Sequence, residues 1–167
     1  MIYSLEEFEK FDKMKSKVLK YVLYKKRTEQ EVRQKFAKEL EENILNDIIE
    51  ELKENLYIND YNYIERAVSE FVNLKSLSIK EIRYKLYSKG IKSSLIDEYI
   101  DKNIDEMQEY EEKSACKIFN KKIQSMEEEE IKIFLMKKGY KEESIKSACN
   151  QWKDYIERIE LQKCKMC

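Results

Sequence analysis

The chain has 167 residues, of which 40% are charged and 42% hydrophobic, and its formal net charge is −1. With two glycines and no proline, it lacks the turn residues that a β-rich fold needs, and its aliphatic content is too high for a disordered chain. Near-neutral charge excludes a strong overall attraction to nucleic acid, and the absence of histidine removes the commonest general base and metal ligand. An all-α fold is predicted.

The predicted helices begin at capping boxes. In such a box a cap hydroxyl accepts the amide proton of the third helical residue, and a glutamate three positions later reaches back to the cap amide. The boxes start at Ser4, Thr28, Ser78 and Ser125, and each opens a run of apolar residues at helical spacing. The predicted helices cover residues 5–26, 28–39, 44–55, 60–74, 78–89, 93–104, 105–123, 125–138 and 142–160.

Three of these helices carry related sequences. EVRQKF (31–36) aligns with EIRYKL (81–86) and EIKIFL (130–135), at offsets of 50 and 49 residues. Gly90 and Gly139 follow the second and third, where a left-handed C-cap residue is favoured. The sequence therefore predicts three tandem three-helix, helix-turn-helix-like repeats in an elongated, curved array. The predicted boundaries are 1–58 for the first repeat with its N-terminal helix extension, 59–104 for the second, 105–161 for the third, and 162–167 for a frayed tail.

Apolar residues at helical spacing are predicted to close the core of the first two repeats. In the first repeat they are Val18, Val22, Val32, Phe36, Ile48, Ile49 and Leu52, and in the second Ile64, Val68, Phe71, Ile82, Leu86, Ile96 and Ile100.

The aromatic side chains allow two interpretations. Trp152 and the twelve tyrosines could stack on exposed bases. Most tyrosines, such as Tyr21, Tyr84 and Tyr99, lie in phase with the apolar residues, so packing in the core or between repeats is the preferred interpretation.

The four cysteines all lie in the C-terminal third. Cys116 and Cys149 are predicted to be small buried hydrophobes. Cys164 and Cys167 have the spacing of a metal knuckle or redox pair, but no further ligands complete a site. We predict no metal site and no cofactor, and the thiols fit a reduced, cytoplasmic protein. No apolar run approaches the roughly 20 residues of a membrane span.

Charge is segregated in blocks along the chain. Residues 10–38 and 71–92 are basic, whereas 39–70 and 93–112 are acidic. Within the acidic blocks, residues 39–54 and 97–112 would keep the protein off bulk nucleic acid, contact a basic patch on a partner, or serve solubility alone.

Arg33, Arg83 and Lys132 occupy the same position in the three related helices, and are called the cation row below. Stacked repeats would align them along a regularly spaced acidic partner, and binding would then depend on salt. For any single lysine, a solvated helix face is the plainer interpretation. The predicted filament- and DNA-binding residues are Lys25, Lys26, Arg27, Arg33, Lys35, Lys80, Arg83, Lys85, Lys89, Lys132 and Lys138. No side chains suggest catalysis, so a non-enzyme is predicted.

Three segments resemble the RecX family, regulators of the RecA recombinase. YVLYKKRTEQEVRQKF (21–36) resembles the family's opening repeat, and IKEIRYKLYSKGI (79–91) its second-repeat helix. LYINDYNYI (56–64) resembles its apolar-Asp turn, with Asp60 and Tyr63 at the Asp and aromatic positions. The resemblance covers roughly residues 15–155 and is weaker in the third repeat. The sequence departs from the family at Ile64, where many members have alanine, and at 74–77, which replaces the usual glycines.

The resemblance implies a protein that binds RecA and the groove of the RecA–single-stranded DNA filament. Inhibition of the recombinase is the expected effect, with disassembly or stimulation as alternatives. Weak direct DNA binding is a further expectation, and a monomer is expected because tandem repeats already supply an extended surface. From a different class, a helix-turn-helix transcription regulator is an alternative function, as is a helical scaffold for another protein.

Overall fold

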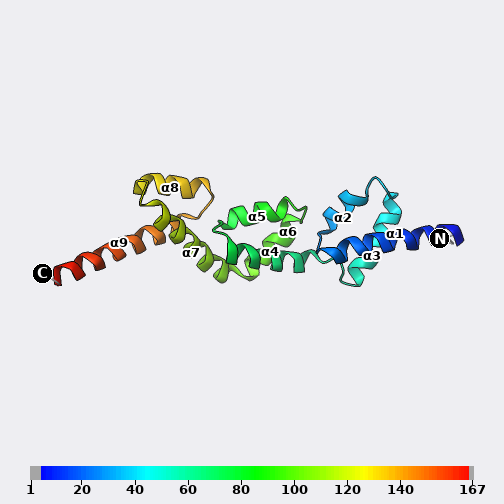
Figure 1. Ribbon diagram of the computed structural model, residues 1–167, viewed down its shortest axis with the longest axis horizontal. Helices are drawn as coiled ribbons and strands as arrows, with labels where there is room; N and C mark the ends of the chain where they lie inside the picture. The colour runs from blue at the N-terminus through cyan, green and yellow to red at the C-terminus, as the bar shows by residue number, and fades with distance from the viewer. Residues whose placement is uncertain (1–4, 166–167) are drawn as a thin grey trace. The chain divides into compact units, whose positions relative to one another are not determined.

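The computed structural model describes the backbone of residues 5–165 and the side chains of residues 9–162. That part of the chain contains nine α-helices and no strand (Figure 1), which confirms the all-α prediction. The helices are α1 (Leu5–Tyr24), α2 (Glu29–Phe36), α3 (Glu42–Glu54), α4 (Asp60–Leu74), α5 (Ile79–Tyr87), α6 (Ser93–Lys102), α7 (Ile104–Lys122), α8 (Glu128–Lys137) and α9 (Glu142–Lys165).

Two of the predicted capping boxes are confirmed. The Glu31 amide donates to the Thr28 hydroxyl at 3.1 Å, and the Thr28 amide donates to the Glu31 carboxylate at 3.2 Å. Ser78 and Glu81 form the same pair of bonds at 3.1 and 3.0 Å. These bonds satisfy amides that have no partner within the helix. The box predicted at Ser4 lies outside the described residues.

The box predicted at Ser125 is wrong. The cap of α8 is Glu127, whose carboxylate accepts from the amide of Glu130 while the Glu130 side chain accepts from the Glu127 amide. Ser125 instead belongs to the turn that ends α7, where its amide and hydroxyl both donate to the Lys122 carbonyl, at 2.9 and 3.3 Å. A serine engaged in closing one helix cannot cap the next.

The chain divides into two compact units. Unit 1 consists of Met1–Ala67 and Leu86–Ile96, and unit 2 of Val68–Lys85 and Asp97–Cys167. The division into three repeats and their stacking remain predictions.

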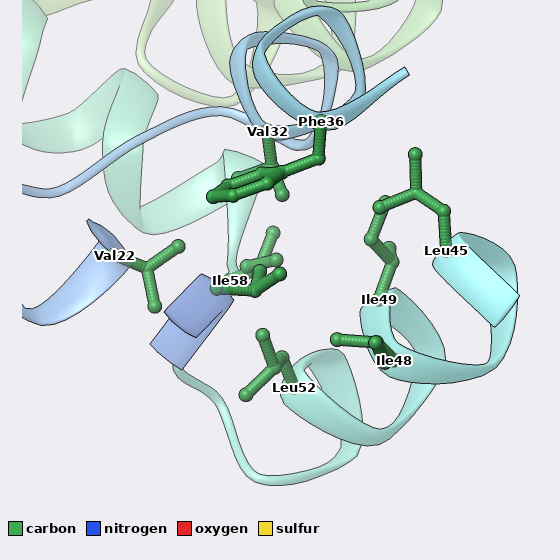
Figure 2. Packing of buried hydrophobic residues seen from close by; sticks show 9 residues of the cluster. Val22, Val32, Phe36, Leu45, Ile48, Ile49, Leu52 and Ile58 are labelled. Carbon is green, nitrogen blue, oxygen red and sulfur yellow. The ribbon is translucent and has the colours of Figure 1, made fainter. Parts of the chain in front are cut away.

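The core of unit 1 is formed by α1, α2, α3 and the turn before α4. In Figure 2 the side chains of Val32 and Phe36 on α2 point toward Ile58 and toward Ile48 and Leu52 on α3. Burying each aliphatic side chain contributes about 1.5–3 kcal/mol, so this cluster is what holds the short helix α2 in place.

The core of unit 2 contains a second cluster, from α7, α8 and α9. Phe119, Ile131 and Leu135 are fully buried within it. α7 and α9 run in the same direction, because contacts between them advance together along both helices. Glu111 in the first half of α7 meets Ser144 near the start of α9, and Asn120 near the end of α7 lines one surface pocket with Tyr155, further along α9.

The predicted core residues are buried, except that Phe71 is partly exposed. The prediction that Tyr84 packs in the interior is wrong, since 72% of it is exposed. Ile82 and Leu86 form the buried face of α5, and a residue two positions from each lies on the opposite face. Gly90 and Gly139 have φ of 77° and 85°, which confirms the predicted left-handed caps.

The end of α3 has a left-handed residue that is not glycine. Leu56 has φ of 59°, and its amide donates to the Lys53 carbonyl at 2.9 Å while the Tyr57 amide donates to the Leu52 carbonyl at 2.8 Å. This is the Schellman arrangement, in which glycine is usual at the position of Leu56. The Leu56 side chain is 65% exposed, so packing does little to offset the backbone strain.

Replacing Leu56 with glycine is expected to raise the free energy of unfolding by about 1 kcal/mol. A left-handed conformation costs an L-residue roughly 1–2 kcal/mol, which glycine avoids. Glycine also has more conformational freedom in the unfolded state, and this cancels part of the stabilisation. Urea unfolding followed by circular dichroism measures the change. Leu56→Ala keeps the strain and is the control. If both variants lose stability equally, the leucine side chain stabilises the fold and the strain argument is wrong.

Candidate functional site

In unit 1 the start of α2 is bonded to the turn that follows α5. The Thr28 hydroxyl donates to the Lys89 carbonyl at 2.8 Å, and the Lys89 ammonium pairs with Glu31 at 3.0 Å. The next residue, Gly90, lies so close to Gln30 that an added Cβ would stand 2.2 Å from Gln30 Cγ. Lys89, a predicted binding residue, therefore holds the capping glutamate of α2.

Unit 2 has the same arrangement between α5 and the turn after α8. The Ser78 hydroxyl donates to the Lys138 carbonyl at 2.6 Å, and Lys138 pairs with Glu81 at 3.0 Å. An added Cβ on Gly139 would stand 2.7 Å from Cδ of Lys80. Lys138 thus has the same structural contact as its counterpart in unit 1, and the stem of Lys80 packs against the turn.

A carboxylate completes each of these junctions. Asp60 accepts a hydrogen bond from the Glu29 amide at 2.9 Å, and Glu111 accepts one from the Ile79 amide at 2.7 Å. Both donors are the first amides of their helices, which have no helical partner and lie at the positive end of the helix dipole. The Asp60 singled out in the sequence is therefore an anchor for α2.

The pKa of the Asp60 carboxyl is raised above its ordinary 3.8, because burial outweighs the opposing hydrogen bond from the Glu29 amide. A carboxyl whose folded pKa is raised contributes stability at low pH that is lost as the pH rises through the folded value. Asp60→Asn keeps an acceptor without the charge. We expect the stability of this variant, relative to the wild type, to increase between about pH 4 and pH 7. Urea unfolding at both pH values measures this.

Asp60→Ala is the control, since it removes the acceptor and should be less stable than the wild type at both pH values. The comparison is the free energy of unfolding of Asp60→Asn minus that of the wild type. If this difference does not change with pH, or falls as the pH rises, ionised Asp60 does not destabilise the fold.

The three cations of the cation row are each engaged by acids of the chain itself. In Arg33 two guanidinium nitrogens lie 2.8 and 2.7 Å from one Glu29 oxygen. The pairs are Arg33 with Glu29, Arg83 with Asp97, and Lys132 with Glu128 and Glu129. A partner would therefore have to compete with these acids for the row.

The other predicted site residues differ in their surroundings. No ion pair with another described side chain is recorded for Lys25, Lys26 or Lys80, and all three are exposed. Lys35 is exposed on α2, while Lys85 is partly buried on α5.

Unit 1 has a surface pocket of about 300 Å³ between the end of α1, the turn after α3 and the start of α4. We call it the basic pocket. It brings together two predicted site residues with side chains that the sequence did not single out for binding. The lining includes the cations Lys26, Arg27 and Arg66, the rings of Tyr57 and Tyr63, and one carboxylate, Glu65.

Sequence reasoning missed Tyr57 and Arg66 in this site. Asn62 and Arg66 are four residues apart and therefore share a face of α4, which was a usable signal. That this face lies beside Lys26 is a consequence of tertiary packing.

Among the described residues, no group of three or more acidic or cysteine side chains is placed to hold a metal ion. Cys116 and Cys149 are buried free thiols, as predicted, and burial raises the pKa of each. The side chains of Cys164 and Cys167 lie outside the described residues, although the α9 backbone continues to Lys165. None of the described helices has both the length and the apolar character needed to cross a membrane.

Comparison with known proteins identifies the family. The chain is 35% identical over 150 residues to the regulatory protein RecX of Clostridium beijerinckii, an alignment that covers 84% of this chain and 68% of the relative. It is 32% identical over 157 residues to that of Clostridium tetani, covering 88% and 70%. The chain belongs to the RecX family. The RecX of Clostridioides difficile is 28% identical over 156 residues, covering 89% of this chain and 72% of the relative.

Solved RecX structures share the fold. A crystal structure of RecX from Lactobacillus salivarius superposes with a TM-score of 0.74 and 24% identity, covering 86% of this chain and 96% of that one. A second RecX crystal structure gives 0.74 and 21%, covering 90% and 81%. No family model matches the chain. The resemblance seen in the sequence is therefore confirmed, and the relatives are named as regulatory proteins.

Proposed function

We propose that this RecX-family chain binds RecA and its filament on single-stranded DNA and inhibits the recombinase. The observation that carries the proposal is membership of a family of regulatory proteins named RecX. We further propose that it acts by binding and not by catalysis, in the cytoplasm, and as a monomer, because tandem repeats already supply an extended surface. The exposed cations on unit 1 suit a polyanionic nucleoprotein partner.

The structure does not favour the helix-turn-helix alternative. A recognition helix inserts its N-terminal residues into the major groove. The N-terminal caps of α2 and α5, Thr28 and Ser78, are fully buried, and acidic residues, Glu29 and Glu81, occupy the first turns. These helix starts are therefore covered by their own junctions and carry the wrong charge for DNA.

The experiment is a pull-down of RecA by the full chain, with and without single-stranded DNA and nucleotide, together with a RecA ATPase assay. We expect retention of RecA and a fall in DNA-dependent ATP hydrolysis. Sedimentation of the chain alone tests the expected monomer. If the chain retains RecA under none of these conditions, the proposal is contradicted, even if the chain binds DNA alone.

A further inference from the structure

The lining of the basic pocket has three cations, Lys26, Arg27 and Arg66, against one carboxylate, Glu65. Lys26 and Arg66 are exposed, and neither has a recorded ion pair among the described side chains. Arg27 forms a long ion pair with Glu31, at 4.0 Å. Glu31 is already engaged, because it pairs with Lys89 at 3.0 Å and accepts the Thr28 amide. The pocket is therefore set up to receive an anion.

The contacts of Arg27 inside the protein satisfy its guanidinium only in part. Its Nε is the one buried side-chain nitrogen or oxygen without a hydrogen bond in the part of the chain that the structure describes. Its guanidinium lies 4.7 Å from the centre of the Tyr21 ring. That ring packs edge-on against Phe36 of the core, with centroids 5.5 Å apart. The cation is thus held in position before any ligand binds, which lowers the entropic cost of binding.

The wall of the pocket is aromatic. Tyr57 is 39% exposed, and it follows Leu56, the strained residue whose conformation orients the turn at the pocket. Backbone strain of this kind persists where the surrounding structure over-determines it, often at binding sites. A volume of about 300 Å³ is at the lower end of ligand pockets, which suits one planar group and one anion.

We propose that the basic pocket binds a single nucleotide unit. The phosphate contacts Lys26, Arg27 and Arg66, and the base stacks on Tyr57. The unit is either a free nucleotide or one residue of a single-stranded nucleic acid, since both present a phosphate beside an exposed base. The inference does not rest on the proposed function, because it concerns this chain without RecA.

The test uses the full chain and a fluorescently labelled oligothymidylate, followed by anisotropy. Lys26→Glu/Arg66→Glu should bind at least tenfold more weakly. The matched control is Lys13→Glu/Lys20→Glu, which makes the same charge change at exposed residues that do not line the pocket and are not among the predicted binding residues, and it should stay within about twofold of the wild type. Tyr57→Ala should weaken binding by about five- to a hundredfold, whereas Tyr57→Phe, which keeps the ring, should not.

Competitors separate the sources of the ligand. If thymidine monophosphate displaces the labelled oligothymidylate, a free nucleotide is sufficient to occupy the pocket. Pocket-dependent binding of the oligonucleotide without such displacement identifies a strand. The proposal is overturned if the control pair weakens binding as much as the pocket pair, if Tyr57→Ala binds like the wild type, or if inorganic phosphate competes as well as the nucleotide. Circular dichroism verifies that each variant is folded.

Discussion

Glu111→Ala is expected to lower the free energy of unfolding by about 3 kcal/mol. Glu111 is 1% exposed. It accepts from the Ile79 amide at 2.7 Å, the Lys141 amide at 3.3 Å and the Ser144 hydroxyl at 3.2 Å. One carboxylate therefore joins α7 to the beginnings of α5 and α9. Alanine would leave these donors without an acceptor, and a donor left unsatisfied in the interior costs roughly 1–3 kcal/mol.

Two further variants on α7 make this result interpretable. Glu111→Gln keeps one acceptor oxygen but turns an amide donor toward other donors, so an intermediate loss is expected. Glu109→Ala removes an exposed carboxylate that pairs with Lys113 four residues on, a contact worth at most about 0.5 kcal/mol. Urea unfolding gives all three values. A Glu111→Ala loss no larger than that of Glu109→Ala would mean that the buried carboxylate does not hold the junction together.

Reversing the cation row, with Arg33, Arg83 and Lys132 all changed to glutamate, is expected to abolish inhibition of RecA. Losing several charge contacts with a polyanionic filament should weaken binding by orders of magnitude, and wild-type binding should fall steeply with salt. The assay is RecA ATPase or strand exchange. The ion pairs broken in the variant are partly exposed and contribute about 0–1 kcal/mol each, so circular dichroism should show a folded protein.

Each row cation has an acidic partner in the chain, so its replacement could abolish inhibition in two ways. The cation could contact the filament directly, or it could act by holding its acidic partner in place. A charge swap distinguishes these two causes. Arg83→Glu/Asp97→Lys restores the pair with its polarity reversed. If the swap recovers the inhibition that Arg83→Glu loses, Arg83 acts by holding Asp97. If inhibition stays lost, the arginine contacts the filament. A folded triple variant that inhibits like the wild type would exclude the row as the docking surface, and the acidic helices α3 and α6 would be tested next.

Helix boundaries were predictable because their signals are local. The box at Thr28 and the glycine at 90 act within one turn of a helix, through bonds between residues three apart. The buried stripe of Ile82 and Leu86 follows from helical periodicity alone. Local signals nevertheless gave a wrong cap at Ser125, because the same hydroxyl can close the preceding helix or cap the next one.

The sequence by itself therefore determined the all-helical fold, the approximate positions of its helices, most of the core residues of α1 to α6, and the family. Only the tertiary structure decided the roles of the charged residues. Thr28 meets Lys89 across 61 positions, and Ser78 meets Lys138 across 60. A lysine that holds a capping glutamate and one that lines a pocket look alike in sequence, because a charge acquires its role from the groups within a few ångströms, and those groups come from distant segments.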